Sequence, residues 1–349
     1  MSRKPLRILR LILIIVLLIL AAINLHLFQV YISTLYNDDC EEILKAVLKD
    51  KYLSVKGNHG RIGNQLWTFA AGLSFAKALN RTFYISKNVD IHDKIMKERI
   101  ITERIFPRLK DLYVHIRPPK SMEKVVPHSH FYGKDDCCRY QDPLDHASET
   151  SPFLMLDTSF TQHIKNIYEN IDEFKKYLEF NSQIKIKGRR YMDANALRSS
   201  DGILCAHIRM TDFVRINRTV PREVLLALTE YVLVKEKKKK ILLFGDDRSF
   251  LHEMLHALTK KGKIETGIVS DNESGVDLFL ASEVCSSYLI THQSTTFGFW
   301  SAFLTKNWKS VYFYYVPYQE PTLYRSDFLL PWNAIGYSGN QVAPITLVN

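Results

Sequence analysis

The fold is decided by a stretch in the second half of the chain, Cys205-Ala206-His207-Ile208-Arg209-Met210-Thr211-Asp212-Phe213. The apolar run Ile203–Ala206 is typical of a buried strand, and charged residues follow where that strand would give way to a loop. Ligands of open α/β sheets bind at the carboxyl ends of the strands. An arginine there, Arg209, can hold a carboxylate or phosphate through two parallel hydrogen bonds. The stretch therefore predicts an α/β sheet with an anion site at its edge.

Strand and helix patterns alternate through the rest of the second half. Strands are expected at 203–208, 241–244, 265–269, 287–291 and 311–315. Helices are expected at 222–234, 249–260, 275–281 and 296–304. This alternation is typical of a parallel sheet that helices cover on both faces.

The first half begins with a strand, a glycine loop, a helix and a second strand. The expected elements are strands at 51–55, 81–86, 113–117 and 153–156 and helices at 64–79, 92–105 and 162–179. Glycines at 57, 60 and 63 form the loop. The pattern is weakest between 89 and 151, and the boundary between the two halves is expected between Asn181 and Asp201.

Charge gives a coarse restriction on partners. The chain has 349 residues and a formal net charge of +10 at pH 7, which favours anionic ligands or surfaces. No zinc finger, basic zipper or aromatic RNA-binding signature is present, so no nucleic-acid partner is expected. The basic run Lys235–Lys240 separates a helix pattern from a strand pattern and is interpreted as a solvated connection.

The N-terminus has the pattern of a membrane anchor. Basic residues precede an apolar stretch from 11 to 32, close to the ~20 residues that span a bilayer. Basic residues before the stretch and Asp38-Asp39 after it orient the N-terminus to the cytosol. The expected order is a cytoplasmic tail (1–10), a transmembrane signal anchor (11–32) and a stem (33–50). The alternative is a cleaved signal peptide, for which Ala21-Ala22 is a poor cleavage site.

Two further features agree with a lumenal location. Glycosylation sequons begin at Asn80, Asn217 and Asn272. The cysteines are Cys40, Cys137, Cys138, Cys205 and Cys285. Some of them would pair in an oxidising lumen, although Cys205 and Cys285 fit equally well as ordinary buried thiols, and sequence does not assign the pairing.

Polar residues gather at three strand ends of the second half. His207 and Arg209 end one strand, Asp246-Asp247 another, and Ser294-Thr295-Thr296 opens a helix after a third. The helix N-terminus suits a phosphate, and the carboxylates suit a base such as guanine. In the simpler interpretation, each carboxylate or hydroxyl caps the helix that follows it. The coincidence of all three at one sheet edge favours a ligand site.

Metal binding is not expected. No Asp-x-Asp triplet occurs, so charge on a leaving group would be met by arginine and backbone N–H groups. The segment from His128 to His146 holds histidines and Cys137-Cys138 without a zinc spacing, and it is interpreted as a surface loop with a disulfide.

Four motifs in order resemble those of the α-1,2-fucosyltransferase family (glycosyltransferase family 11-like), which is related more distantly to protein O-fucosyltransferases. They are Gly60-Arg61-Ile62-Gly63-Asn64-Gln65-Leu66, the stretch from His207 to Phe213, Phe244-Gly245-Asp246-Asp247, and the segment from Asp277 through Ser294-Thr295-Thr296-Phe297 to Leu304. The resemblance reaches from about residue 52 to 316 and leaves 87–150 unmatched.

The resemblance implies a GT-B fold of two Rossmann-like lobes, an acceptor-side lobe at 51–200 and a GDP-fucose-binding lobe at 201–349. It implies inverting, metal-independent transfer of L-fucose from GDP-fucose to a glycan acceptor, on a glycoprotein or glycolipid, with α-1,2 linkage to terminal galactose. It also implies a type II Golgi membrane protein. Two alternatives are a protein O-fucosyltransferase and a catalytically silent glycan- or nucleotide-binding protein.

The resemblance also implies roles for single residues. Arg209 would bind the donor pyrophosphate and act in catalysis together with Asp212 and Arg61. The other donor-binding residues would be His207, Asp246, Asp247, Ser294, Thr295, Thr296 and Asn64. No catalytic base is assigned, since Asp212 could equally orient Arg209, and His207 could equally be a core histidine. Met210 and Thr211 stand where the family usually has arginine and glycine.

Overall fold

The computed structural model describes Asn24, His26 and the ranges 50–57, 59–86, 94–128, 140–158, 160–215, 219–316 and 330–346. The chain divides into the units Met1–Lys51 and Tyr52–Asn349. The expected anchor and stem lie almost wholly outside the described residues, and so does the sequon at Asn217. No helix in the described ranges has the length and apolar character that a membrane crossing requires.

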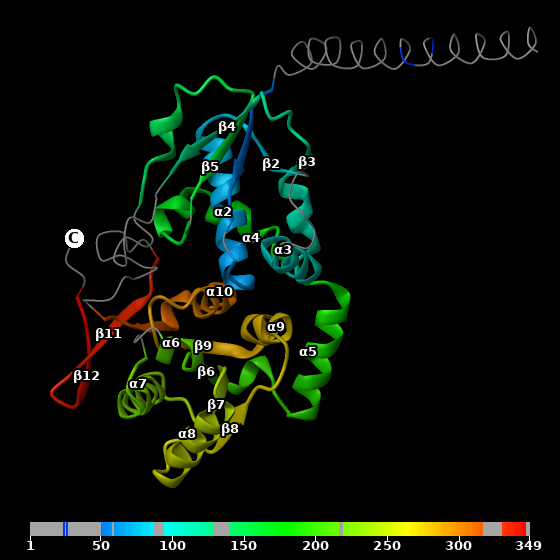
Figure 1. Cartoon of the computed structure of the whole chain (residues 1–349). Helices are drawn as coiled ribbons and strands as arrows, with labels where there is room; N and C mark the ends of the chain where they lie inside the picture. The colour runs from blue at the N-terminus through cyan, green and yellow to red at the C-terminus, as the bar shows by residue number, and fades with distance from the viewer. Residues whose placement is uncertain are drawn as a thin grey trace, which may run out of the picture. The chain divides into compact units, whose positions relative to one another are not determined.

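The first sheet of the second unit consists, within the described residues, of five parallel strands in the order β3-β2-β1-β5-β4 (Figure 1). The strands are β1 (Tyr52–Val55), β2 (Thr82–Ser86), β3 (Val114–Ile116), β4 (Glu123–Pro127) and β5 (Phe153–Asp157). Helices α2 (Ile62–Ala78) and α3 (Lys94–Ile105) follow β1 and β2. The sequence missed β4 (Glu123-Lys124-Val125-Val126-Pro127), which is short and mostly exposed, with only Val126 buried.

Helix α2 is buried along nearly its whole length. Small residues on α2 allow the sheet and other helices to pack against it from several sides. At Gly72, for example, a Cβ would meet the ring of Phe83 at 2.3 Å. A helix buried on most sides carries apolar residues around its circumference and not along a single stripe.

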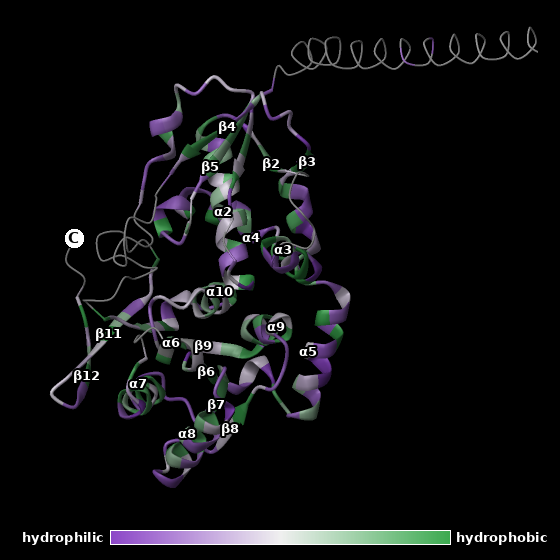
Figure 2. Ribbon diagram, viewed as in Figure 1, coloured by the Kyte–Doolittle hydropathy of each residue, from purple (hydrophilic) through white to green (hydrophobic). Residues whose placement is uncertain are grey.

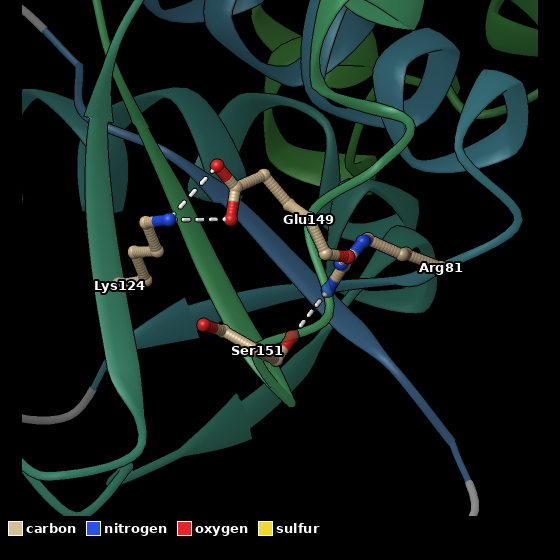
Figure 3. Close-up of polar contacts among 4 residues, drawn as sticks. All are labelled: Arg81, Lys124, Glu149 and Ser151. Atoms are coloured by element: carbon tan, nitrogen blue, oxygen red, sulfur yellow. Dashed lines mark hydrogen bonds and ion pairs between the residues drawn. The ribbon is translucent and has the colours of Figure 1, made fainter.

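Arg81 links two segments of the chain by hydrogen bonds at the amino-terminal edge of this sheet (Figure 3). Its guanidinium is buried and donates to the carbonyl oxygens of Ser151 (2.8 Å) and Glu149 (2.5 Å). The Glu149 carboxylate accepts in turn from Lys124 Nζ at 2.7 and 2.9 Å. The start of β2 is thereby tied to the chain that enters β5.

The second sheet has, in the described ranges, seven strands in the order β12-β11-β10-β9-β6-β7-β8, and β12 alone among them is antiparallel to its neighbour. The strands are β6 (Ile203–Ile208), β7 (Lys240–Gly245), β8 (Thr266–Val269), β9 (Cys285–Ile290), β10 (Val311–Tyr314), β11 (Asn333–Ser338) and β12 (Gln341–Pro344). The helices between them are α6 (Thr211–Arg215), α7 (Arg222–Lys235), α8 (Arg248–Lys260), α9 (Ser274–Val284) and α10 (Thr296–Leu304). Numbered from β6, the order of β6 to β11 is 3-2-1-4-5-6, the doubly wound Rossmann order.

Alternate residues of β6 face different cores. Leu204, Ala206 and Ile208 pack with α7 and α8, whereas Ile203 and Cys205 belong to a larger cluster. That larger cluster includes α9 and α10 together with α2 and the first sheet. Figure 2 shows the apolar residues on the strands and on the inner helices. One hydrophobic core therefore spans one face of the second sheet and the first sheet.

One expectation along the chain is wrong, and one helix was not expected. The helix expected over 162–179 is broken into η3 (Ile164–Asn166), η4 (Tyr168–Asn170) and α4 (Ile171–Lys175). The side chain of Asn166 donates to the Thr161 carbonyl at 3.0 Å, an alternative to regular helix that asparagine favours. The unexpected helix is α5 (Ser182–Ala194), which lies between Asn181 and Asp201 and packs on α9 through the buried Ile184 and Gly188; the lobe boundary there stays a prediction. Its few apolar residues hid it in the sequence.

Cys205 and Cys285 form a disulfide between the neighbouring strands β6 and β9, with 5.5 Å between their Cα atoms. The interpretation of these two cysteines as ordinary thiols is therefore wrong. Both are almost fully buried, so composition alone could not distinguish a disulfide from two buried thiols.

Candidate active site at the edge of the second sheet

The strand order reverses between β6 and β9, which pair in parallel. In doubly wound sheets, ligands bind outside the carboxyl ends of the strands at such a switch point. Two expected segments lie there: Arg209 directly after β6, and residues 291–296 directly after β9. The structure therefore brings the predicted arginine and the predicted hydroxyl cluster to one place.

Arg209 is held by Asp246, which follows the neighbouring strand β7. Arg209 Nε lies 3.3 Å from Asp246 Oδ2, and both side chains are largely buried. Asp246 also accepts from the Met210 amide at 2.8 Å and from the Thr211 hydroxyl at 2.6 Å. Burial raises the pKa of Asp246, but these hydrogen bonds and the charge of Arg209 outweigh it and lower the pKa below its usual value. Asp246 therefore fixes the turn that carries the arginine.

Met210 and Thr211 have structural partners. The Met210 side chain is buried in the core formed with α7 and α8. Thr211 uses both its amide and its hydroxyl on Asp246. The Met210 side chain therefore belongs to the core, while its backbone amide bonds to the carboxylate that holds Arg209.

Asp247 caps helix α8, since its carboxylate accepts from the Phe250 amide at 3.0 Å. This bond agrees with the simpler interpretation of that residue. Base recognition by Asp246 or Asp247 stays a prediction.

The loop from Thr291 to Thr295 is held by its own hydroxyls and by His292. The Thr291 hydroxyl donates to the His207 carbonyl at 2.8 Å, and the Thr295 hydroxyl donates to the His292 carbonyl at 3.0 Å. The Ser294 amide donates to His292 Nδ1 at 3.1 Å. Thr295 precedes α10 without capping it through its side chain. The first turn of α10 therefore presents its backbone N–H groups at this edge.

His207 lies beneath the start of α10. It is buried, and its ring is 5.1 Å from that of Phe297. A Cβ at Gly298 would come within 2.4 Å of Thr295 Oγ1 and 3.1 Å of His207 Nδ1, so this tight approach favours glycine. This surrounding fits the core-histidine interpretation, with α10 resting on the ring.

The glycine loop of the first half reaches the same edge (Figure 1). A Cβ at Gly63 would lie 2.6 Å from Thr296 Oγ1 and 2.8 Å from the Phe297 amide nitrogen. Trp300 Nε1 donates to the Gly63 carbonyl at 2.9 Å. Helices α2 and α10 thus begin side by side. Arg61, exposed at the N-cap of α2, and the half-buried Asn64 lie at this junction.

Sequence reasoning missed two aromatic residues of the site. The Arg209 guanidinium lies 6.0 Å from the centre of the Phe213 ring, which contacts His292 edge-on at 5.0 Å. Trp300 carries the contact to Gly63. Both belong to the motifs already quoted, and their aromatic character was the available signal. Asp212 lies in α6, and its role stays a prediction.

Metal ligands do not cluster in the described ranges: no group of three or more His, Cys, Asp or Glu side chains is placed to share an ion there. His128 Nδ1 and His146 Nε2 lie 3.1 Å apart. The segment between them that holds Cys137-Cys138 is outside the described residues.

The chain is similar to galactoside 2-α-L-fucosyltransferases. One from Caenorhabditis elegans is 24% identical over 292 residues, which cover 80% of this chain and 78% of that protein. Another protein of that organism, svh-11, provisionally named as the same enzyme, is 25% identical over 299 residues, covering 82% and 78%. The resemblance expected from the motifs is confirmed. No protein-family model matches the chain.

Solved structures of fucosyltransferases also align with the chain. A crystal structure of POFUT1 in complex with GDP-fucose aligns with a TM-score of 0.46 and 15% identity over 76% of this chain and 97% of that one. The fucosyltransferase NodZ from Bradyrhizobium aligns with a TM-score of 0.47 and 13% identity over 85% of this chain and 99% of that one.

Proposed function

We propose that the protein transfers L-fucose from GDP-fucose to a glycan, with α-1,2 linkage to terminal galactose. The observation that carries the proposal is the meeting of Arg209, the start of α10 and the Gly60–Asn64 loop at the switch point of the second sheet. The names of the related proteins support fucosyl transfer to a galactoside. The alignments to those relatives cover about four fifths of the chain.

The chemistry demands stabilisation of the departing diphosphate. Fucosyl transfer passes through an oxocarbenium-like state in which negative charge grows on the β-phosphate. A guanidinium has five N–H donors, so Arg209 can hold Asp246 and a diphosphate at the same time. The N-terminus of α10 adds a partial positive charge and backbone donors. These groups would stabilise the leaving group in an inverting transfer that needs no metal.

The proposal includes a two-lobed GT-B arrangement. The lobe at 201–349 would bind GDP-fucose, and the lobe at 51–200 would hold the acceptor, with Arg61 in catalysis and Asn64 in donor binding at the junction of the two lobes. The shared core between α2 and α10 supports a cleft whose two walls keep a fixed relation.

The proposed location is the Golgi membrane, with a single span near 11–32 and the catalytic part in the lumen. The buried disulfide supports an oxidising compartment, where such bonds persist. The exposed sequon at Asn80 agrees with it.

The test is transfer of labelled fucose from GDP-fucose to galactose-terminated glycans by the full chain, with and without EDTA. Arg209→Ala is expected to lower turnover at least ~10²-fold, as single-donor deletions do at other anionic transition states. Arg198→Ala is the matched control, because Arg198 precedes the opposite end of β6 and its side chain is 55% exposed. This substitution should leave transfer unchanged. Near-normal transfer by Arg209→Ala, or loss of transfer in EDTA, would contradict the mechanism.

A further inference from the structure

The chain enters α10 through a tight turn formed by His292, Gln293, Ser294 and Thr295. The Thr295 amide donates to the His292 carbonyl at 3.0 Å, and this bond closes the turn. The Ser294 amide donates to the His292 side chain, at Nδ1. Asn and Asp side chains form the same bond, to the amide two residues later, when they stand first in a turn. His292 therefore takes the place of a short polar side chain in this turn.

The bond to Ser294 also fixes the state of the His292 ring. A backbone amide can only donate, so Nδ1 is the unprotonated nitrogen and the imidazole is neutral, with its proton on Nε2. His292 is 1% exposed, and the Phe213 ring of α6 contacts it edge-on, with 5.0 Å between the ring centres. The ring is therefore held in one orientation, with Nδ1 turned toward the Ser294 amide.

The turn is joined to the strands on both sides of it. Gln293 Nε2 donates to the Val316 carbonyl at 2.7 Å, and Gln293 Oε1 accepts from the Val316 amide at 3.1 Å. Val316 follows β10, so these two bonds lie beyond the last paired residues of β9 and β10. On the other side, the Thr291 hydroxyl bonds to the carbonyl of His207 on β6. Because the base of the turn is fixed on both sides, the bond inside the turn decides the direction in which α10 starts.

His292 takes up two amides of the turn and leaves the next three to the helix start. The amides of Ser294 and Thr295 both donate to His292, one to its ring and one to its carbonyl. The first intrahelical bond of α10 runs from the Phe299 amide to the Thr295 carbonyl at 2.9 Å. The amides of residues 296–298 are therefore the donors that the helix start offers to an anion. If the turn opened, these three N–H groups would change direction.

We propose that His292 is a positioning residue for the donor site. It acts through the turn: as a neutral hydrogen-bond acceptor it orients the amides of residues 296–298 toward the diphosphate of the donor. This inference rests on the proposed function, in which that donor is GDP-fucose.

Two substitutions separate the hydrogen-bond acceptor of His292 from the volume of its ring. His292→Asn keeps an acceptor that can bond to the Ser294 amide but loses most of the ring volume. His292→Leu keeps the volume but accepts no hydrogen bond. The test measures GDP binding by calorimetry and the melting temperature of the full chain near neutral pH, without an acceptor. His256→Leu is the matched control, because His256 is exposed on α8 of the same lobe, and it should leave both quantities unchanged.

The two variants should rank oppositely in the two measurements. His292→Leu should weaken GDP binding about tenfold, the effect of losing one buried hydrogen bond. His292→Asn should bind GDP within about threefold of the wild type, although the missing ring volume should lower its melting temperature more than the leucine does.

GDP affinities that follow the melting temperatures, or that fall equally in both variants, would mean that His292 has only a structural role. Wild-type GDP affinity in His292→Leu would also overturn the proposal. A wild type that binds no GDP would refute the proposed donor and this inference together. A chain whose GDP affinity depends on residue 292 in the expected order but that transfers no fucose would keep the positioning role and refute only the proposed reaction.

Discussion

Asp246 is the residue on which the geometry of the candidate site depends. It accepts hydrogen bonds from the Met210 amide and the Thr211 hydroxyl while it pairs with Arg209. The arginine thus lies at the end of a buried strand beside a charged partner, so under the proposed function it would lose little conformational freedom on binding a diphosphate. This is the arrangement expected of a positioning carboxylate next to a binding arginine.

Asp246→Asn should weaken both transfer and stability. The pKa of Asp246 is lowered in the folded chain, so its contribution to stability is present above the unfolded pKa of about 3.9 and is lost as the pH falls through the folded value. Thermal unfolding should show the variant about 2 kcal/mol less stable at pH 6–7, and the difference in the free energy of unfolding should shrink as the pH falls below about 3.9.

Asp193→Asn is the control for that series, since Asp193 is 73% exposed in a surface pair with Arg198. It should leave the pH profile of stability unchanged. If the free energies of unfolding of Asp246→Asn and the wild type differ by the same amount at every pH, the loss of stability comes from packing and not from the charge of Asp246.

The sequence predicted the position of Arg209 after a strand, but not which of the two carboxylates, Asp246 or Asp247, would pair with it. A strand end followed by polar residues is visible in a single sequence, because burial dictates the apolar run. Asp246 and Asp247 have the same chemistry and adjacent positions, so only the register of β7 against β6 shows that one holds the arginine turn and the other caps α8.

At the scale of elements, the site depends on the close approach of α2 and α10. Gly63→Ala would place a methyl group 2.8 Å from the Phe297 backbone nitrogen, so one helix must shift. Such overpacking costs about 1–3 kcal/mol and would move Arg61 and Asn64 away from the start of α10. We expect a lower melting temperature and a loss of transfer of about tenfold or more, because misplacement of about 1 Å at a catalytic centre is already costly.

Gly57→Ala is the matched control on the same loop. A Cβ there would meet its neighbours at 3.4 Å or more, which is ordinary contact. If Gly57→Ala and Gly63→Ala lower the melting temperature and the transfer rate equally, any change in the loop is harmful and its close approach to α10 is not the cause.

The disulfide joins the two strands that flank the switch point. Cys205 and Cys285 are 80 residues apart in sequence, so the bond restricts a long loop of the unfolded chain. The double variant Cys205→Ala/Cys285→Ala should lose about 2–4 kcal/mol in chemical denaturation. Peptide mapping without reductant should recover the two cysteines on one linked fragment; recovery of two free thiols would contradict the bond.

Elements with strong local patterns were predicted closely, and elements held by tertiary contacts were not. Helix α10 has the predicted bounds of 296–304, because its apolar residues are continuous. The short, exposed edge strand β4 and the antiparallel pair β11 and β12 were missed, because pairing with neighbouring strands, and not a buried apolar run, holds them in the sheet. Helix α5 was missed because only Ile184 and Gly188 of its residues are buried.

At the scale of the whole molecule, the sequence and the structure give separate indications of the cellular compartment of the protein. The apolar stretch at 11–32 and the sequons predict a lumenal chain, and the buried disulfide supports the same conclusion. The two described sequons differ. Asn80 is exposed in a turn directly after α2, with φ near +49°, whereas Asn272 is half-buried and donates to Ser270 Oγ at 2.9 Å.

Glycosylation should therefore favour Asn80. The full chain carrying Asn217→Gln, translated with microsomal membranes, should gain glycan chiefly at Asn80, because an accessible asparagine in a surface turn can enter the transferase and a bonded one cannot do so as readily. Asn80→Gln in that background should remove most of the glycosidase-sensitive mobility shift, and Asn272→Gln should remove little. If the chain gains no glycan and is digested by added protease, the lumenal orientation is refuted. The disulfide would then need another source of oxidant.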